Sequence, residues 1–296
     1  IKYLTIAFGL ENNNNLCYLN SLIQSLTSCT VFNEYMIKNE PNYIKNKNKL
    51  ALSFISIIKN NINNITNINN NNNKQYNVEI LYELILLKKR NNKCFNYFGQ
   101  QDVSECLAFI LDSLNDEYLN TLFYHKYRCN IICISCSKII DIPDDISYQF
   151  EVPSTINENN ISRKLKLETV KLDYKCSNCG DELNIYKINR LVYTPPIIII
   201  NLNKYNNKYN FEYSDTIIID NKNKKNQYRY KLISTIEHSS NNNGGGHYVS
   251  RCIKLNKKNK CITFLFNDNS IEHSNLLPTK NTYLLFYHLE KTEYYI

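Results

Sequence analysis

Two pairs of cysteines with the same internal spacing place the strongest constraint on how this 296-residue chain can fold. Cys133 and Cys136 form one C-x-x-C pair, and Cys176 and Cys179 form a second pair about forty residues later. Four thiolates around one ion make the closed tetrahedral site in which structural zinc is bound. Each pair would then lie in its own β-turn, and the metal would join two hairpins that are distant in the sequence. The cysteines therefore predict a β-rich region held together by structural zinc.

Other interpretations of these cysteines remain open. The four thiols could be free structural cysteines, or only one pair could matter, as a redox couple. A catalytic zinc site is disfavoured, because such a site keeps an open position and usually has histidine or carboxylate ligands. The chain has 11 cysteines, and this odd count suits a reducing compartment better than a set of disulfides. A cytoplasmic or nuclear location is therefore expected.

The composition predicts a globular protein with polar inserts. Hydrophobic residues make up 43% of the chain, which is enough to build a core. Asparagine is concentrated in tracts such as residues 60–73, whose side chains cannot bury much apolar surface, so a loosely ordered insert is expected there. The chain begins with Ile1 rather than methionine, and it is expected to be a monomeric domain within a longer protein.

Charge and hydropathy argue against two classes of partner. The formal net charge is +8, but the lysines are scattered among asparagines rather than gathered on one helix face, so nucleic acid is not an expected partner. No window of the sequence holds eighteen apolar residues, so no membrane-spanning segment is expected.

The spacing of apolar residues changes along the chain, from a helical period to short β-rich runs. Helices are predicted at 16–26, 50–58, 78–87 and 103–114. The last helix has a marked start, because Asp102 is a good N-cap residue and Glu105 follows three positions later. Strands are predicted at 123–132, 139–142, 146–152, 183–192, 197–202, 228–236, 247–255, 261–266 and 283–289. The predicted fold class is therefore α+β, with the helices in the first part of the chain and the strands after them.

Cys17 stands at the start of the first predicted helix, after the four asparagines 12–15. The unpaired N–H groups of a helix start lower the pKa of a thiol, which favours a nucleophilic thiolate. Such a nucleophile also needs a base and a group that orients the base. Of the five histidines, His247 is the best candidate base, because it follows three glycines and precedes a strand. Asn267 and Asp268 end another strand and could orient its imidazole. Taken alone, a cysteine at a helix start is more often a packing residue, and a histidine beside glycines often lies in a surface turn. Only the combination of these residues favours catalysis.

Several stretches, in order along nearly the whole chain, can be compared with known motifs. GLENNNNLCYLNSLIQSL (9–26) contains the candidate nucleophile, FGQQDVSECLAFILDSL (98–114) contains the predicted capping box, and GGGHYVS (244–250) contains the candidate base. Together they resemble the cysteine box, the QQD helix and the histidine box of the ubiquitin-specific proteases, a family of deubiquitinases. Further matches are the two cysteine pairs, LVYTPPIIIINLNKY (191–205), TFLFNDNSI (263–271) and YLLFY (283–287).

The resemblance implies a single catalytic domain with a papain-like fold and structural zinc, which hydrolyses the bond after the C-terminal glycine of ubiquitin. Residues 1–122 would form its thumb, 123–190 its fingers with the zinc knuckles, and 191–296 its palm. The implied partners are ubiquitin and ubiquitinated proteins. Alternatives are a catalytically silent ubiquitin-binding scaffold, and a protease for another ubiquitin-like modifier. The implied site residues are Cys17 as nucleophile, His247 as base, Asn267 and Asp268 as orienting groups, Asn12 as oxyanion donor, and Gln100, Asp102, Glu105 and Tyr248 as contacts of the ubiquitin tail.

The sequence departs from the family pattern near the nucleophile and in the QQD helix. Asn14 replaces a glycine of the cysteine box; if that position needs a positive φ, asparagine is among the least costly replacements. Leu16 replaces a threonine, and Ser104 and Cys106 replace a histidine and a phenylalanine. Catalysis is expected to survive these packing changes. For Asp102 and Glu105, a purely structural role as a capping box stays open.

Overall fold

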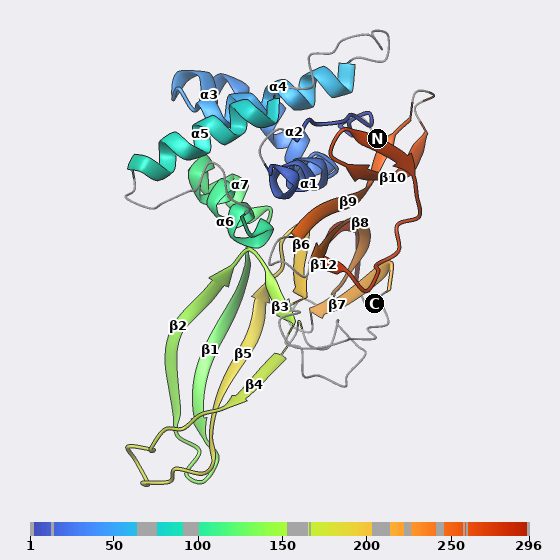
Figure 1. The fold of residues 1–296 in the computed structure, drawn as a ribbon. Helices are drawn as coiled ribbons and strands as arrows, with labels where there is room; N and C mark the ends of the chain where they lie inside the picture. Colours follow the sequence, from blue (N-terminus) through green and yellow to red (C-terminus); the bar gives the residue numbers. More distant parts are fainter. Residues whose placement is uncertain are drawn as a thin grey trace.

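The computed structural model shows an α+β protein, which confirms the predicted class (Figure 1). It describes residues 3–12, 15–63, 76–90, 101–152, 165, 167–202, 214–221, 226–240, 246–256, 258 and 260–294. Among these residues, none of the helices has the length and apolar character needed to cross a bilayer. The helices are α1 (Cys17–Leu26), α2 (Thr30–Lys38), α3 (Glu40–Lys45), α4 (Lys49–Asn63), α5 (Tyr76–Arg90), α6 (Val103–Leu114) and α7 (Glu117–Thr121).

Helix α1 is the central element, although its sequence suggests an ordinary amphipathic helix. All ten of its residues are buried, because it packs against α5 and α6 on the helical side and against strands on the other. Its polar side chains are buried with hydrogen-bond partners: Ser25, for example, donates to the carbonyl of Ser21 at 2.9 Å. By contrast, α6 buries only the face that the apolar spacing predicts, from Val103 to Leu114.

Four antiparallel strands form an extended sheet, here named the finger sheet, which projects away from the helices (Figure 1). Its strands are β1 (His125–Cys133), β2 (Ile139–Ser147), β4 (Leu167–Lys171) and β5 (Ile185–Tyr193), in the order β2-β1-β5-β4. Its far end has a small separate core, the tip core, made of the buried Cys133, Cys176 and Ile185.

The remaining strands form an eight-stranded sheet, here named the palm sheet, with the order β11-β10-β9-β8-β12-β6-β3 and with β7 paired to β8. The isoleucine run 197–200 lies in β6, where every residue is buried. β3 pairs with β6 in parallel, so it belongs to the palm sheet although it lies within 123–190, the range predicted for the fingers. The strands are β3 (Phe150–Val152), β6 (Ile197–Leu202), β7 (Thr216–Asn221), β8 (Asn226–Ser240), β9 (Gly246–Leu255), β10 (Cys261–Asn267), β11 (Ser270–His273) and β12 (Thr282–Tyr294).

One lysine is buried where the palm sheet meets α1. Lys254 of β9 is 0% exposed, and its Nζ donates hydrogen bonds to Thr27 Oγ1 at 2.7 Å and to Thr5 Oγ1 at 2.8 Å. These partners are neutral hydroxyls, so they do not neutralise an ammonium charge. Burial therefore lowers the pKa of Lys254 to about 7.

Candidate active site

Cys17 is the first residue of α1 and is 2% exposed. The helix start was expected to lower the pKa of its thiol, but the net effect in the structure is the opposite. Burial raises the pKa of Cys17 most strongly, the charge of Asp268 raises it further, and a hydrogen bond from the backbone of Tyr248 lowers it. The removal of water from the thiol therefore outweighs the helix start. Tyr248 directly follows His247 in the sequence, so this hydrogen bond holds Cys17 close to the segment that carries the candidate base.

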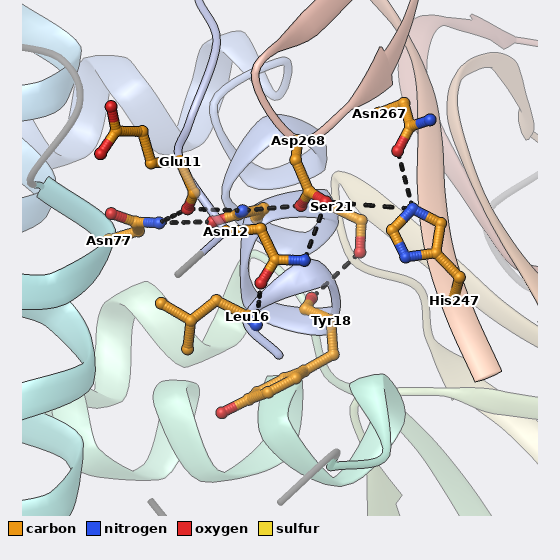
Figure 2. Close-up of polar contacts among 10 residues, drawn as sticks. Glu11, Asn12, Leu16, Tyr18, Ser21, Asn77, His247, Asn267 and Asp268 are labelled. Atoms are coloured by element: carbon orange, nitrogen blue, oxygen red, sulfur yellow. Dashed lines mark hydrogen bonds and ion pairs between the residues drawn. The ribbon is translucent and has the colours of Figure 1, made fainter. Parts of the chain in front are cut away.

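His247 and Asn267 are brought together by neighbouring strands of the palm sheet, β9 and β10. Nε2 of His247 lies 2.7 Å from Oδ1 of Asn267, an ordinary hydrogen-bond distance (Figure 2). An amide oxygen only accepts, so this bond requires a proton on Nε2. In the neutral imidazole, Nδ1 is then left as the basic nitrogen, which is the arrangement that a general base needs.

Asp268 lies between this pair and the cysteine box. Its Oδ2 accepts a hydrogen bond from Nδ2 of Asn12 at 2.9 Å and lies 3.9 Å from Nε2 of His247. The Oδ1 of Asn12 accepts from the backbone N–H of Leu16 at 2.6 Å. The two hydrogen bonds fix the orientation of the Asn12 amide directly in front of α1, and among the residues that the structure describes one of its two N–H hydrogens has no acceptor.

Backbone geometry holds the turn that carries Asp268 against the N-terminal segment. Asp268 has φ = 53°, a left-handed conformation that aspartate adopts more readily than most residues. Its carbonyl accepts a hydrogen bond from the N–H of Leu10 at 3.2 Å. A Cβ on Gly9 would lie 2.7 Å from the carbonyl oxygen of Asn269, so the close approach of the two segments requires glycine at position 9.

Two asparagines that were not predicted as site residues, Asn20 and Asn77, extend this network, and Figure 2 labels Asn77. Nδ2 of Asn20 donates to Oδ1 of Asp268 at 2.8 Å and to the carbonyl of Glu11 at 3.1 Å. Nδ2 of Asn77 donates to Oδ1 of Asn20 at 2.8 Å and to the same carbonyl of Glu11 at 2.6 Å. A signal existed for Asn20, because a polar residue occupies the buried side of the predicted helix. Asn77 gave no such signal, because in the sequence it looks like one more asparagine after the asparagine-rich tract.

The asparagine run before Cys17 contains one residue with a left-handed backbone. Asn15 has φ = 57°, a conformation in which asparagine is enriched. From the sequence, a positive φ was considered at Asn14, the position of the family's glycine, but Asn14 lies outside the described residues. Leu16, which precedes Cys17, supplies the backbone N–H that binds Asn12.

Of the residues predicted to contact a ubiquitin tail, Asp102 is already used within the chain. Its Oδ1 accepts from the backbone N–H groups of Ser104 and Glu105, at 2.8 and 3.1 Å, and so caps α6. Its Oδ2 accepts from the hydroxyl of Tyr283 at 2.8 Å. Asp102 therefore has the capping role that the structural alternative gives it, and its contact with a ubiquitin tail stays a prediction. Glu105 is exposed, and Gln100 lies outside the described residues.

Tyr248 packs among aromatic rings next to the candidate base. Its ring stacks on His238 at a centroid distance of 4.4 Å, and Tyr283 lies near both rings. His238 was not identified from the sequence. It leaves no room for a side chain on Gly246, whose Cβ would lie 2.0 Å from His238 Nε2. The glycine before His247 is therefore required by packing.

The four cysteines of the two C-x-x-C pairs meet at the end of the finger sheet. Their sulfur atoms all lie within 4.8 Å of one another, and Sγ of Cys133 is 3.6 Å from Sγ of Cys179, while Sγ of Cys136 is 3.7 Å from Sγ of Cys176. A tetrahedral zinc site with Zn–S bonds of about 2.3 Å requires sulfur separations of about 3.8 Å. The four residues thus fit a metal ion of this kind.

Comparisons with known proteins agree with this arrangement. The sequence profile of the family described as ubiquitin carboxyl-terminal hydrolase matches residues 8–287. Human ubiquitin carboxyl-terminal hydrolase 26 is 25% identical over an alignment 246 residues long, which covers 68% of this chain and 25% of that protein. Mouse ubiquitin carboxyl-terminal hydrolase 17-like protein A is 21% identical over an alignment 320 residues long with its gaps, which covers 94% of this chain and 56% of that protein. The chain thus spans a quarter of one relative and just over half of the other.

The fold is also that of solved structures from this family. A SAGA DUB module of Ubp8, Sgf11, Sus1 and Sgf73 bound to monoubiquitin superposes with a TM-score of 0.75 at 17% identity, and the match covers 98% of this chain and 71% of that one. The same module bound to ubiquitin aldehyde gives a TM-score of 0.73 at 16% identity, with 98% and 71% covered. The predicted papain-like fold is confirmed by these matches. Because the family profile spans most of its length, the chain belongs to the ubiquitin carboxyl-terminal hydrolase family.

Proposed function

We propose that the chain is a thiol-dependent deubiquitinase that cleaves the bond after the C-terminal glycine of ubiquitin. The observation that carries the proposal is the 2.7 Å hydrogen bond between His247 and Asn267, beside a cysteine at the start of a buried helix. Membership of the ubiquitin carboxyl-terminal hydrolase family supports the substrate, as do the similar structures, which were solved with bound monoubiquitin and with bound ubiquitin aldehyde.

The proposed reaction assigns one task to each of these side chains. Nδ1 of His247 takes the proton of the Cys17 thiol, and the sulfur attacks the carbonyl carbon of the ubiquitin glycine. The oxyanion that forms is stabilised by the remaining N–H of Asn12 and by backbone N–H groups. His247 then gives the proton to the departing lysine amine as the C–N bond breaks, which leaves a thioester. Water hydrolyses the thioester, with His247 as base, and the thiol is regenerated.

The environment of Cys17 suits a nucleophile that loses its proton only during the reaction. Its thiol is buried and its pKa is raised, so the neutral thiol is the resting form. Transfer of its proton to His247 produces the thiolate during the reaction rather than before it. Asn267 holds the imidazole in the tautomer that can accept this proton.

The cysteine cluster is proposed to hold a structural zinc ion. Hydrogen bonds from the side chain of Asn178 and the backbone of Lys138 lower the pKa of Cys136, and backbone hydrogen bonds from Cys179 and Asn178 lower that of Cys176. These hydrogen bonds favour thiolate ligands at two of the four positions, whereas burial raises the pKa of Cys133. Four protein ligands leave no open position, so the ion would stabilise the end of the finger sheet and take no part in the chemistry. The finger sheet is proposed to grip the body of ubiquitin while its tail enters between α1 and β9.

The test is a reaction with ubiquitin that carries a C-terminal electrophile. A covalent adduct is expected with the unaltered protein, and Cys17→Ala should abolish it. Cys261→Ala is the matched control, because Cys261 is a free and exposed cysteine, and this variant should react normally. Saturable binding without an adduct would instead indicate the silent scaffold, and reaction only with the probe of another modifier would overturn the ubiquitin assignment.

A further inference from the structure

The hydrogen bonds around Asp268 point to a residue that controls the active site from a helix outside it. We propose that Asn77, at the start of α5, is a positioning residue that holds the carboxylate of Asp268 in place through Asn20. The inference rests on the proposed function, because Asp268 lies between the proposed oxyanion donor Asn12 and the proposed base His247.

The chain of hydrogen bonds has a fixed direction. A carboxylate only accepts, so Asn20 must present its Nδ2 to Asp268, and this bond measures 2.8 Å. Oδ1 of Asn20 then faces the other way and requires a donor. Asn77 supplies that donor through its Nδ2, at 2.8 Å.

Asn77 is itself held in one orientation. Its Oδ1 accepts from the backbone N–H of Val78 at 2.9 Å, and its Nδ2 also donates to the carbonyl of Glu11 at 2.6 Å. Both amide hydrogens therefore have an acceptor, and the side chain is 0% exposed. Because a buried polar group without a partner is costly, rotation of this amide would be strongly unfavourable.

Asp268 connects the orientation of Asn77 to the groups that take part in the reaction. With Asn77 in place, Asn20 cannot turn its oxygen toward the carboxylate, where the two acceptors would repel each other. Asp268 then keeps both its oxygens in position, one bonded to Asn20 and the other to Asn12. Without Asn77, Oδ1 of Asn20 loses its donor, so the Asn20 amide is held only through its Nδ2. Asp268, and with it the amide of Asn12, is then held less firmly.

The test uses Asn77→Leu, which keeps the branched shape and removes both donors. The matched control is Asn33→Leu. Asn33 is also 0% exposed and donates to two backbone carbonyls, those of Tyr3 and Thr27, at 2.7 and 2.8 Å. Within the described part of the chain it has no hydrogen bond to the network of Asp268. If the leucine variants do not fold, Asn77→Ser and Asn33→Ser replace them.

With ubiquitin that carries a fluorogenic C-terminal amide, Asn77→Leu should lower kcat by about tenfold to a hundredfold. This is less than the loss of about a hundredfold to a thousandfold that follows removal of an oxyanion donor, because Asn12 itself stays in the site. KM should change by less than about threefold, because Asn77 touches no substrate. In an Asp268→Asn background the same substitution should have almost no further effect, since residues that act as a unit are not additive. Asn33→Leu should lower the melting temperature while it leaves kcat unchanged. A normal kcat in Asn77→Leu, or losses that multiply in the double variant, would overturn the proposal.

A second measurement separates failure of this inference from failure of the proposed function. Alkylation of Cys17 by iodoacetamide requires no ubiquitin. Its rate should change by at least about threefold in both Asn77→Leu and Asp268→Asn, without addition in the double variant, and should stay unchanged in Asn33→Leu. A protein that ignores ubiquitin but shows this pattern would contradict only the proposed substrate. Equal alkylation rates in all variants would contradict the positioning role.

Discussion

The buried amine of Lys254 should make the stability of the folded protein depend on pH between about 6 and 9. Burial lowers the pKa of Lys254 from 10.5 to about 7, so the unfolded chain binds more protons in the range between these values. Stability therefore rises as the pH rises through this range, and the full penalty is present below pH 7. For a side chain that is 0% exposed, this corresponds to a rise of about 2.5 kcal/mol in the free energy of unfolding between pH 6 and pH 9.

The substitution Lys254→Met isolates this contribution from all other titrating groups. The variant loses the hydrogen bonds to Thr5 and Thr27, which costs about 1–2 kcal/mol at every pH, but it has no charge to bury. It should thus be more stable than the natural protein at pH 6, and the difference should almost vanish at pH 9. The measurement is the free energy of unfolding from denaturant titrations at four pH values, with exposed Lys231→Met as the control. A difference between the two proteins that stays constant within about 0.5 kcal/mol would refute the reasoning.

Three further predictions concern the fingers, α6 and the turn that carries Asp268. Cys176→Ser should abolish zinc retention and raise KM for ubiquitin substrates with little change in kcat, and an unchanged KM in metal-free protein would contradict this. Asp102→Ala should lower the free energy of unfolding by about 1 kcal/mol, whereas Glu105→Gln should leave it unchanged and raise KM; an unaltered KM would remove Glu105 from the tail site. Gly9→Ala should lower kcat, because its Cβ would displace the Asn269 carbonyl 2.7 Å away, and normal kinetics would show that this contact is not needed.

The sequence predicted the elements whose chemistry is local. The apolar spacing of 103–114 and the cap at Asp102 were sufficient for α6, because both depend on neighbouring residues. The C-x-x-C spacing likewise predicted the sulfur cluster. The pairing of β3 with β6 could not be predicted in this way, because it joins segments far apart in the chain.

The candidate site likewise has residues that the sequence could predict and properties that it could not. The motifs pointed to His247 and Asn267, and the structure places them at hydrogen-bond distance; their catalytic roles stay predictions. The pKa of Cys17 was predicted in the wrong direction, because a helix start is visible in a sequence whereas burial on all sides is not. Asn77 was missed for a similar reason, since its importance depends on partners in two other segments.

The separate tip core of the finger sheet implies that the protein does not unfold as one unit. The buried residues Cys133, Cys176 and Ile185 form a cluster apart from the larger cores of the helices and the palm sheet, and a metal ion would supply much of its stability. Amide hydrogen exchange at the ends of β1 and β5 should thus follow the concentration of free zinc, while exchange in α1 should follow the denaturant. The end of the finger sheet would then unfold and refold with the supply of zinc, and binding of a large substrate would follow it, while the segments that carry Cys17 and His247 stay folded.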